Sequence, residues 1–138
     1  MFKQYNENPA QNLGIDCTVR AISTVLDQDW DTTYVGVCIE GFCVKDMPSA
    51  NHVWGAYLRH HGFVRSIIPD ECPDCYTVVD FCADHPRGIY LLALSSHAVA
   101  VIDGDYYDTW DSGDKIPLYY WQRKEDLSLI HISEPTRR

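Results

Sequence analysis

The chain has little positive charge. Only 11 of its 138 residues are Lys or Arg, against 20 Asp and Glu, and the formal net charge is −9. A surface of that sign repels a phosphate backbone, so a nucleic-acid-binding module is not expected. The sequence also lacks any apolar run close to the roughly 20 residues that a membrane span requires. We therefore expect neither nucleic acid nor a membrane as a partner.

The N-terminal segment lacks the apolar stretch of a secretory signal peptide, since it begins MFKQYNEN. The expected location is therefore cytoplasmic, in the cytosol of a bacterium, of a phage-infected cell or of another host. In such a reducing compartment, the six cysteines are more typical of catalysis, metal binding or burial than of disulfides.

Nothing in the sequence divides the chain, because it has no internal repeat and no low-complexity linker. Its 46% hydrophobic residues are enough for the core of one domain, which we predict over residues 1–124. Residues 127–138 resemble the translation of a sequencing adapter. We therefore expect residues 125–138 to form a frayed or artefactual tail, and we exclude His131 from every candidate site.

Helical spacing of apolar residues dominates the first half of the chain. Asp16 is a good N-cap for the first helix, and Thr77 is one for the last. The predicted helices run from Asp16 to Leu26, over about 31–40 with a stop at Gly41, from 48–49 to Gly62, and from Thr77 to 86–88.

The second half changes to the spacing of strands, which we predict over residues 89–94, 97–102, 105–110 and 116–121. Asp103-Gly104 between two such runs is the strongest short-range signal for a β-hairpin. Pro117 predicts that the last strand lies at an edge of the sheet. Helices followed by an antiparallel sheet indicate an α+β fold.

Cys17 directly follows the predicted cap and lies in the first turn of a helix. Unpaired N–H groups and the helix dipole stabilise a thiolate at that position, which favours a nucleophile. The alternative is a buried cysteine that acts only as a small apolar residue. A nucleophilic cysteine needs a base, and His97 at the start of a strand is the candidate, although a lone histidine on a strand often has only a structural role.

The predicted hairpin gives His97 a partner. A two-residue turn at Asp103-Gly104 places His97 opposite Trp110, and Asp108 becomes its diagonal neighbour on the same face. Asp108 is then expected to orient the imidazole, with Trp110 covering the contact. A one-residue bulge would select Asp111 instead, so Asp111 is the reserve orienting residue.

These two segments resemble those of papain-like cysteine peptidases. The stretch QNLGIDCTVRAIS, residues 11–23, is similar to the segment around their nucleophile, where a Gln lies six residues before the Cys that opens the central helix. The stretch from His97 to Trp110 is similar to their His strand and later Asn-Ser-Trp. Compact relatives, such as bacteriocin-exporter peptidase domains and small bacterial or phage cysteine peptidases, use Asp as the third member. The Gly-Ser-Cys-Trp neighbourhood of plant and lysosomal members is absent.

The resemblance implies a papain-like fold and a role for each matching residue. Cys17 would attack a carbonyl carbon, His97 would protonate the leaving amine, and Asp108 would orient His97. Gln11 would donate its side-chain amide to the oxyanion, with Asn12 as the donor if the loop is shifted by one residue.

The implied activity is hydrolysis of peptide or isopeptide bonds through a thioester, on a polypeptide substrate or a host protein, with no cofactor required. The same triad would also serve transglutaminase-like acyl transfer or deamidation. A third possibility, from a different class, is a catalytically silent papain-fold binding module.

A second group of residues has the spacing of metal ligands. Cys72 and Cys75 form a C-x2-C pair, and Cys82 and His85 form a C-x2-H pair. Four such ligands fit a structural zinc site with tetrahedral geometry. In the competing interpretations Cys82 lies on the buried face of a helix, and Cys72 and Cys75 either form a disulfide or lie near Cys38 and Cys43.

Overall fold

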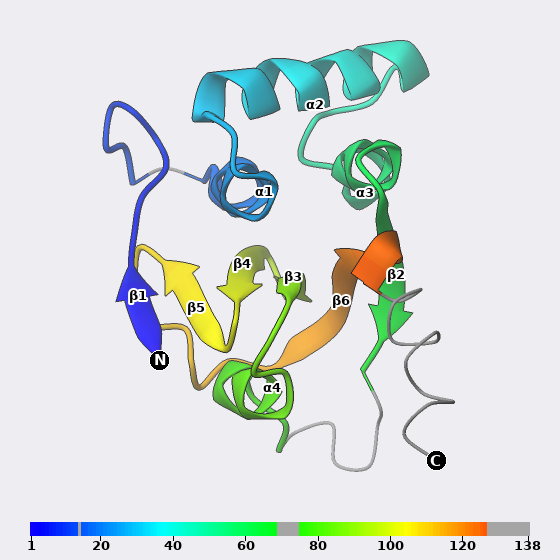
Figure 1. The fold of residues 1–138 in the computed structure, drawn as a ribbon. Coiled ribbons are helices and arrows are strands. Elements are labelled where there is room, and N and C mark those ends of the chain that lie inside the picture. The colour runs from blue at the N-terminus through cyan, green and yellow to red at the C-terminus, as the bar shows by residue number, and fades with distance from the viewer. Residues whose placement is uncertain (14, 69–74, 127–138) are drawn as a thin grey trace.

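The computed structural model describes residues 1–13, 15–68 and 75–126 (Figure 1). Helices dominate the first half and strands the second, which confirms the predicted α+β class. The elements in chain order are β1 (Phe2–Gln4), α1 (Cys17–Leu26), α2 (Trp30–Val44), α3 (Asn51–His60), β2 (Phe63–Ile67), α4 (Val78–Asp84), β3 (Ile89–Leu94), β4 (His97–Ile102), β5 (Asp105–Asp108) and β6 (Pro117–Arg123).

The strands form one six-stranded sheet in the order β1-β5-β4-β3-β6-β2. Strand β1 pairs in parallel with β5, and the other neighbours are antiparallel. Helices α1, α2 and α3 lie over one face of the sheet, and α4 lies against the other (Figure 1). None of the helices in the described part of the chain is both long and apolar enough to cross a bilayer.

Each face of the sheet has its own core, because successive side chains of a strand point to opposite faces. Leu91 and Ala93 of β3, with Ala98 and Ala100 of β4, pack against α1 and α3. The alternate residues, Leu92, Val99 and Val101 among them, pack against Phe81 of α4. The alanines beneath α1 occupy little space, so the helix lies close to β4. This close approach brings the start of α1 to the start of β4.

The predicted helices are confirmed, but the predicted stop at Gly41 is wrong. Helix α2 continues to Val44 and ends at Lys45, whose φ is +60°. Gly41 is buried inside the helix, and a Cβ there would approach the backbone oxygen of Asp46 to 2.5 Å. Gly41 therefore makes room for the turn that follows the helix rather than ending it.

The prediction that the last strand lies at an edge is also wrong. Strand β6 lies between β3 and β2. Pro117 is its first residue, at the irregularity in the register opposite Leu94, where a missing N–H does not interrupt a regular ladder. The edges are instead formed by β1 and β2, which the strand analysis did not predict.

Candidate active site

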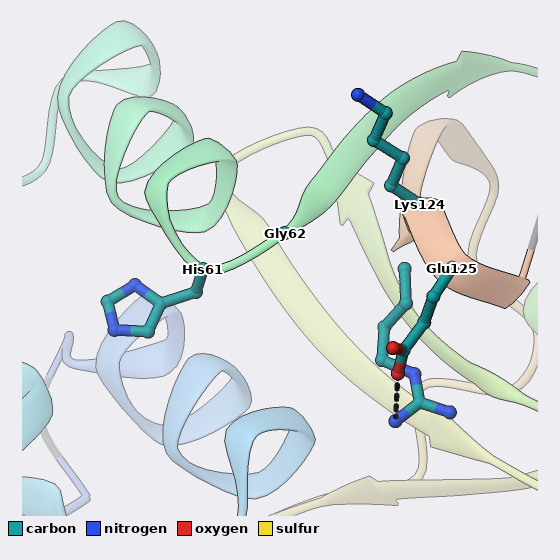
Figure 2. A pocket seen from close by; sticks show the side chains of 5 residues that line it. His61, Gly62, Lys124 and Glu125 are labelled. Carbon is teal, nitrogen blue, oxygen red and sulfur yellow. Dashed lines mark ion pairs between the residues drawn. The ribbon is translucent and has the colours of Figure 1, made fainter.

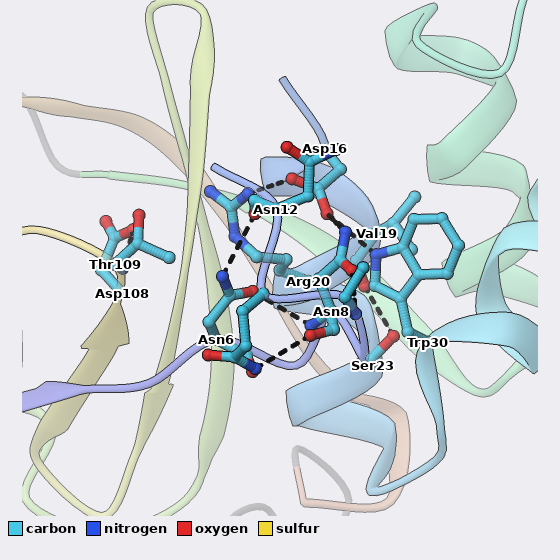
Figure 3. Close-up of polar contacts among 12 residues, drawn as sticks. Asn6, Asn8, Asn12, Asp16, Val19, Arg20, Ser23, Trp30, Asp108 and Thr109 are labelled. Carbon is cyan, nitrogen blue, oxygen red and sulfur yellow. Dashed lines mark hydrogen bonds and ion pairs between the residues drawn. The ribbon is translucent and has the colours of Figure 1, made fainter. Parts of the chain in front are cut away.

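Cys17 is the first residue of α1 and is partly buried. Asp16 occupies the N-cap position as predicted, but its carboxylate does not bond the helix N–H groups. It accepts hydrogen bonds from Asn8 Nδ2 and Trp30 Nε1, each at 2.9 Å, and from the guanidinium of Arg20 (Figure 3). The predicted capping role of Asp16 is therefore wrong. As a result, the N–H groups of the first turn are not occupied by the Asp16 side chain.

The hairpin of β4 and β5 has the predicted register. Ile102 pairs with Asp105, and Ala100 pairs with Tyr107. His97 Nε2 lies 2.6 Å from Asp108 Oδ2, and the side chains of His97 and Asp108 are only 12% and 3% exposed. Trp110 stacks on the imidazole, with ring centroids 4.9 Å apart. The predicted contact between His97 and Asp108, and its cover by Trp110, are both present.

Asp108 is held by two further donors. The Ser112 hydroxyl donates to Asp108 Oδ2 at 2.8 Å, and the Thr109 backbone N–H donates to Oδ1 at 2.8 Å. Ser112 is fully buried. These bonds fix the carboxylate that in turn fixes the His97 ring. The sequence analysis did not identify Ser112, and its only local signal is a hydroxyl four residues after the acid, in a turn.

The thiol of Cys17 is hydrogen-bonded to the His97 side chain. Since Nε2 of His97 contacts Asp108, its Nδ1 is the atom that faces the sulfur. Burial acts to raise the pKa of Cys17, but the hydrogen bond and charge of His97, with bonds from the Ala98 backbone and Thr18, outweigh it and lower that pKa. Burial likewise acts to lower the pKa of His97, but Asp108 and Cys17 outweigh it and raise that pKa to about 9. Both shifts therefore favour the thiolate–imidazolium form of the pair over the neutral form.

These shifts predict how stability depends on pH. The charge on His97 stabilises the fold fully below its ordinary pKa of 6.5, and this contribution is lost as the pH rises through about 9. The Cys17 thiolate contributes above its ordinary pKa of 9.0, and this contribution is lost as the pH falls through the lowered value. Where the pH lies above both 6.5 and the lowered pKa of Cys17 but below about 9, the folded pair holds one proton on His97 and the unfolded pair holds one on Cys17. The pair therefore adds almost no pH dependence in that range.

Replacing Cys17 by alanine removes the titrating thiol and leaves His97 as the titrating group of the pair. In C17A we expect the free energy of unfolding to fall as the pH rises above 6.5, by up to about 1.4 kcal/mol per pH unit relative to the wild type. Urea unfolding at several pH values between 6 and 9 measures the difference. C38A, in helix α2, is the matched control and should follow the wild type. Parallel curves for C17A and C38A would contradict the ion pair.

Two cavities of about 350 and 310 Å³ lie on either side of the Cys17–His97 pair. Ile15, Cys17, Ser96 and His97 line both of them. The larger continues to residues of α3, β3 and β6, including Trp54, Ala93 and Tyr119. The smaller continues to Arg20, Thr109 and Trp110. Together they leave room on both sides of a bond placed over the sulfur.

The predicted oxyanion donors do not reach these cavities. Gln11 Nε2 donates to the carbonyl oxygens of Asn6 and Asn8, at 3.2 and 2.9 Å. The carbonyl of Asn12 accepts from Asn6 Nδ2 at 3.1 Å, and neither Gln11 nor Asn12 lines the cavities. The structure therefore does not bring Gln11 or Asn12 to the cavities, because the loop before Cys17 folds onto its own asparagines, and their oxyanion role stays a prediction. Among the described residues, the start of α1 offers the Cys17 backbone N–H as a donor at the site.

The reserve orienting residue, Asp111, faces the other side of the sheet. It accepts hydrogen bonds from the Tyr106 hydroxyl and the Gly113 backbone N–H. Tyr106 belongs to the core beneath α4. The register of the hairpin has no bulge that would redirect Asp111, so of these two acids it is Asp108 that contacts His97.

The three predicted zinc ligands that the structure describes, Cys75, Cys82 and His85, are not gathered around one centre. Cys75 is disulfide-bonded, which removes its thiol as a zinc ligand, while Cys72 lies outside the described residues. Cys82 is buried against the sheet, and burial raises the pKa of its thiol to about 11. The His85 ring stacks on Phe81, and its Nδ1 lies 2.9 Å from the Phe81 carbonyl oxygen. Within residues 1–13, 15–68 and 75–126, no three His, Cys, Asp or Glu are arranged to hold a metal ion.

A further cavity of about 410 Å³ lies at the end of α3 and β6, lined by His61, Gly62, Arg123, Lys124 and Glu125 (Figure 2). Arg123 forms ion pairs with Glu125 and Asp126. None of its lining residues contributes to the pair of cavities at Cys17.

Comparisons of the chain with protein-family models, with curated proteins and with solved structures gave no match. The assignment of a function therefore depends on the geometry around Cys17.

Proposed function

We propose that the protein is a papain-like thiol hydrolase that cleaves peptide or isopeptide bonds. The observation that carries the proposal is the continuous contact from the Cys17 thiol through the His97 ring to the Asp108 carboxylate. The lowered pKa of Cys17 and the raised pKa of His97 support the same assignment, since a nucleophilic thiolate beside an imidazolium is the reactive form.

In the first half of the reaction, the Cys17 thiolate attacks the carbonyl carbon and forms the S–C bond. The negative charge that develops on the carbonyl oxygen is stabilised by the Cys17 backbone N–H at the start of α1. His97 Nδ1 gives its proton to the leaving amine, the C–N bond breaks, and a thioester remains on Cys17.

In the second half, neutral His97 takes a proton from water, and the resulting hydroxide attacks the thioester. The S–C bond breaks, the acid product leaves, and the thiolate–imidazolium pair is restored. Asp108 keeps Nδ1 directed at the sulfur in both halves, because it holds Nε2 on the opposite side of the ring. The two cavities that meet at Cys17 provide space for chain on both sides of the scissile bond.

Alkylation of the free cysteines tests the thiolate. With iodoacetamide at pH 6.5, we expect Cys17 to be modified about ten to a hundred times faster than Cys43, because the hydrogen bond and charge of His97 lower the pKa of Cys17 and so favour its thiolate. Cys43 is the internal control, since it is exposed and Cys17 is partly buried. Mass spectrometry of the digested protein gives both rates from one sample. Equal rates, or a faster reaction at Cys43, would contradict the proposal.

Cleavage of a library of internally quenched peptides tests the reaction itself. The wild type should cleave members of the library, and C17A should cleave none. Ammonia release or amine incorporation without chain cleavage would point to the acyl-transfer alternative. A reactive Cys17 with no turnover of any amide would favour the binding module.

A further inference from the structure

The carboxylate next to the nucleophile joins three segments of the chain. Asp16 accepts hydrogen bonds from Asn8 in the N-terminal loop, from Arg20 one turn along α1, and from Trp30 at the start of α2 (Figure 3). Each donor is itself held. Asn8 is buried and its Oδ1 accepts from the Ala10 N–H, while the Trp30 ring is stacked on Tyr34 with centroids 4.9 Å apart.

Asp16 and Arg20 form a largely buried ion pair beside the site. Their side chains are 16% and 10% exposed. An uncompensated negative charge on Asp16, which directly precedes Cys17 in the chain and is shielded from water, would oppose the formation of a thiolate. The Arg20 guanidinium cancels that charge, and Arg20 itself lines the smaller cavity together with Cys17 and His97.

We propose that Asp16 and Arg20 are positioning residues for Cys17. Asp16 fixes the backbone from which Cys17 enters the helix, by fastening it to Asn8 and Trp30. Arg20 keeps the carboxylate neutralised, so that the sulfur faces His97 without a competing negative charge. The inference rests on the proposed function only in taking Cys17 as the nucleophile.

The other charged and titratable groups around Cys17 are the same in every variant used below. His97 reaches it from β4, Asp108 and Tyr107 from β5, and Tyr5 and Glu7 from the N-terminal segment. A difference between Arg20 variants therefore reports on the Asp16–Arg20 pair.

The test is the pH dependence of Cys17 alkylation by iodoacetamide. In R20Q, Asp16 keeps its charge and loses its cation, so the apparent pKa of alkylation should rise by about one unit. The rate at pH 7 should then fall about tenfold. R20K retains the positive charge and should recover most of the rate.

A second variant tests whether the hydrogen bond from Trp30 to Asp16 positions Cys17, without changing any charge. W30F removes the Nε1–H donor to Asp16 and keeps a ring for the stack on Tyr34. We expect kcat for peptide cleavage to fall several-fold at unchanged KM, and Cys17 alkylation at pH 7 to slow in parallel.

The matched control is D29A. Asp29 precedes Trp30 and caps α2, with its carboxylate accepting from the Thr32 N–H at 3.1 Å. D29A therefore weakens the same helix start without a change at Asp16. It should leave the pH dependence of Cys17 alkylation unchanged. If R20Q and W30F match the wild type, or D29A shifts the profile equally, the inference is overturned. In either case, rapid alkylation of Cys17 in the wild type still supports the proposed function. Slow alkylation of wild-type Cys17 would contradict the proposed function whatever the variants show.

Discussion

Replacing His97 by alanine is expected to lower kcat/KM for peptide cleavage by on the order of 10⁴-fold. The variant loses both the cation that stabilises the Cys17 thiolate and the acid that protonates the leaving amine. The apparent pKa of Cys17 should return toward the ordinary value for a thiol, so its alkylation at pH 6.5 should slow to the rate of exposed Cys43. Steady-state kinetics on the best quenched peptide and the two alkylation rates measure these effects.

H52A is the control for the loss of a histidine. His52 lies on α3, exposed, with Nε2 2.5 Å from an Asp46 carboxylate oxygen, and it does not line the cavities at Cys17. We expect H52A to keep wild-type kinetics and wild-type alkylation. If H97A retained more than about a tenth of the activity, or if H52A lost as much, His97 would not be the base.

The part of the site that the sequence predicts is the part that local rules determine. Asp103-Gly104 sets the hairpin, the hairpin sets the register, and the register places Asp108 beside His97. The Cys17 position follows from helical periodicity and from the N-cap position of Asp16. Each step uses residues that are close in the chain, so a short-range sequence pattern is sufficient to predict it.

The parts that failed depend on contacts between distant segments. Whether Asp16 caps its helix is decided by Trp30 and Asn8, which compete for the same carboxylate. The side chain of Gln11 is directed away from the site by the carbonyls of Asn6 and Asn8. No rule of spacing predicts these partners, because they meet only after the loop and α2 have packed against α1.

The edges of the sheet were missed for a related reason. Strand β1 has three residues, and β2 has five, of which only Phe63 is buried. Segments so short carry too little periodicity to distinguish a strand from a loop. Their conformation is fixed by pairing with β5 and β6, which lie more than fifty residues away along the chain.

Asp108 is the second residue whose loss should have a large effect. In D108A we expect kcat/KM to fall by about 10³-fold, since the His97 ring is no longer held with Nδ1 toward the sulfur. D108N keeps an oxygen that accepts from Nε2 but removes the charge, so its loss should be smaller, about ten- to a hundredfold. In both variants the pKa of His97 should fall from about 9 toward 6.5. The basic limb of the pH–rate profile, which reports deprotonation of the imidazolium, should then move to lower pH.

A carboxylate that faces away from the site separates this effect from a general loss of acidic charge. D111N changes an acid three residues along the chain, which bonds Tyr106 on the opposite face of the sheet, and it should keep the wild-type pH profile. D108A should also be less stable than D108N, because it leaves the Ser112 hydroxyl and the Thr109 N–H without their acceptor, at about 1–3 kcal/mol for each buried group. A basic limb that stays near pH 9 in D108N would mean that Asp108 does not set the charge on His97. The charge on His97 would then have to be maintained by the Cys17 thiolate.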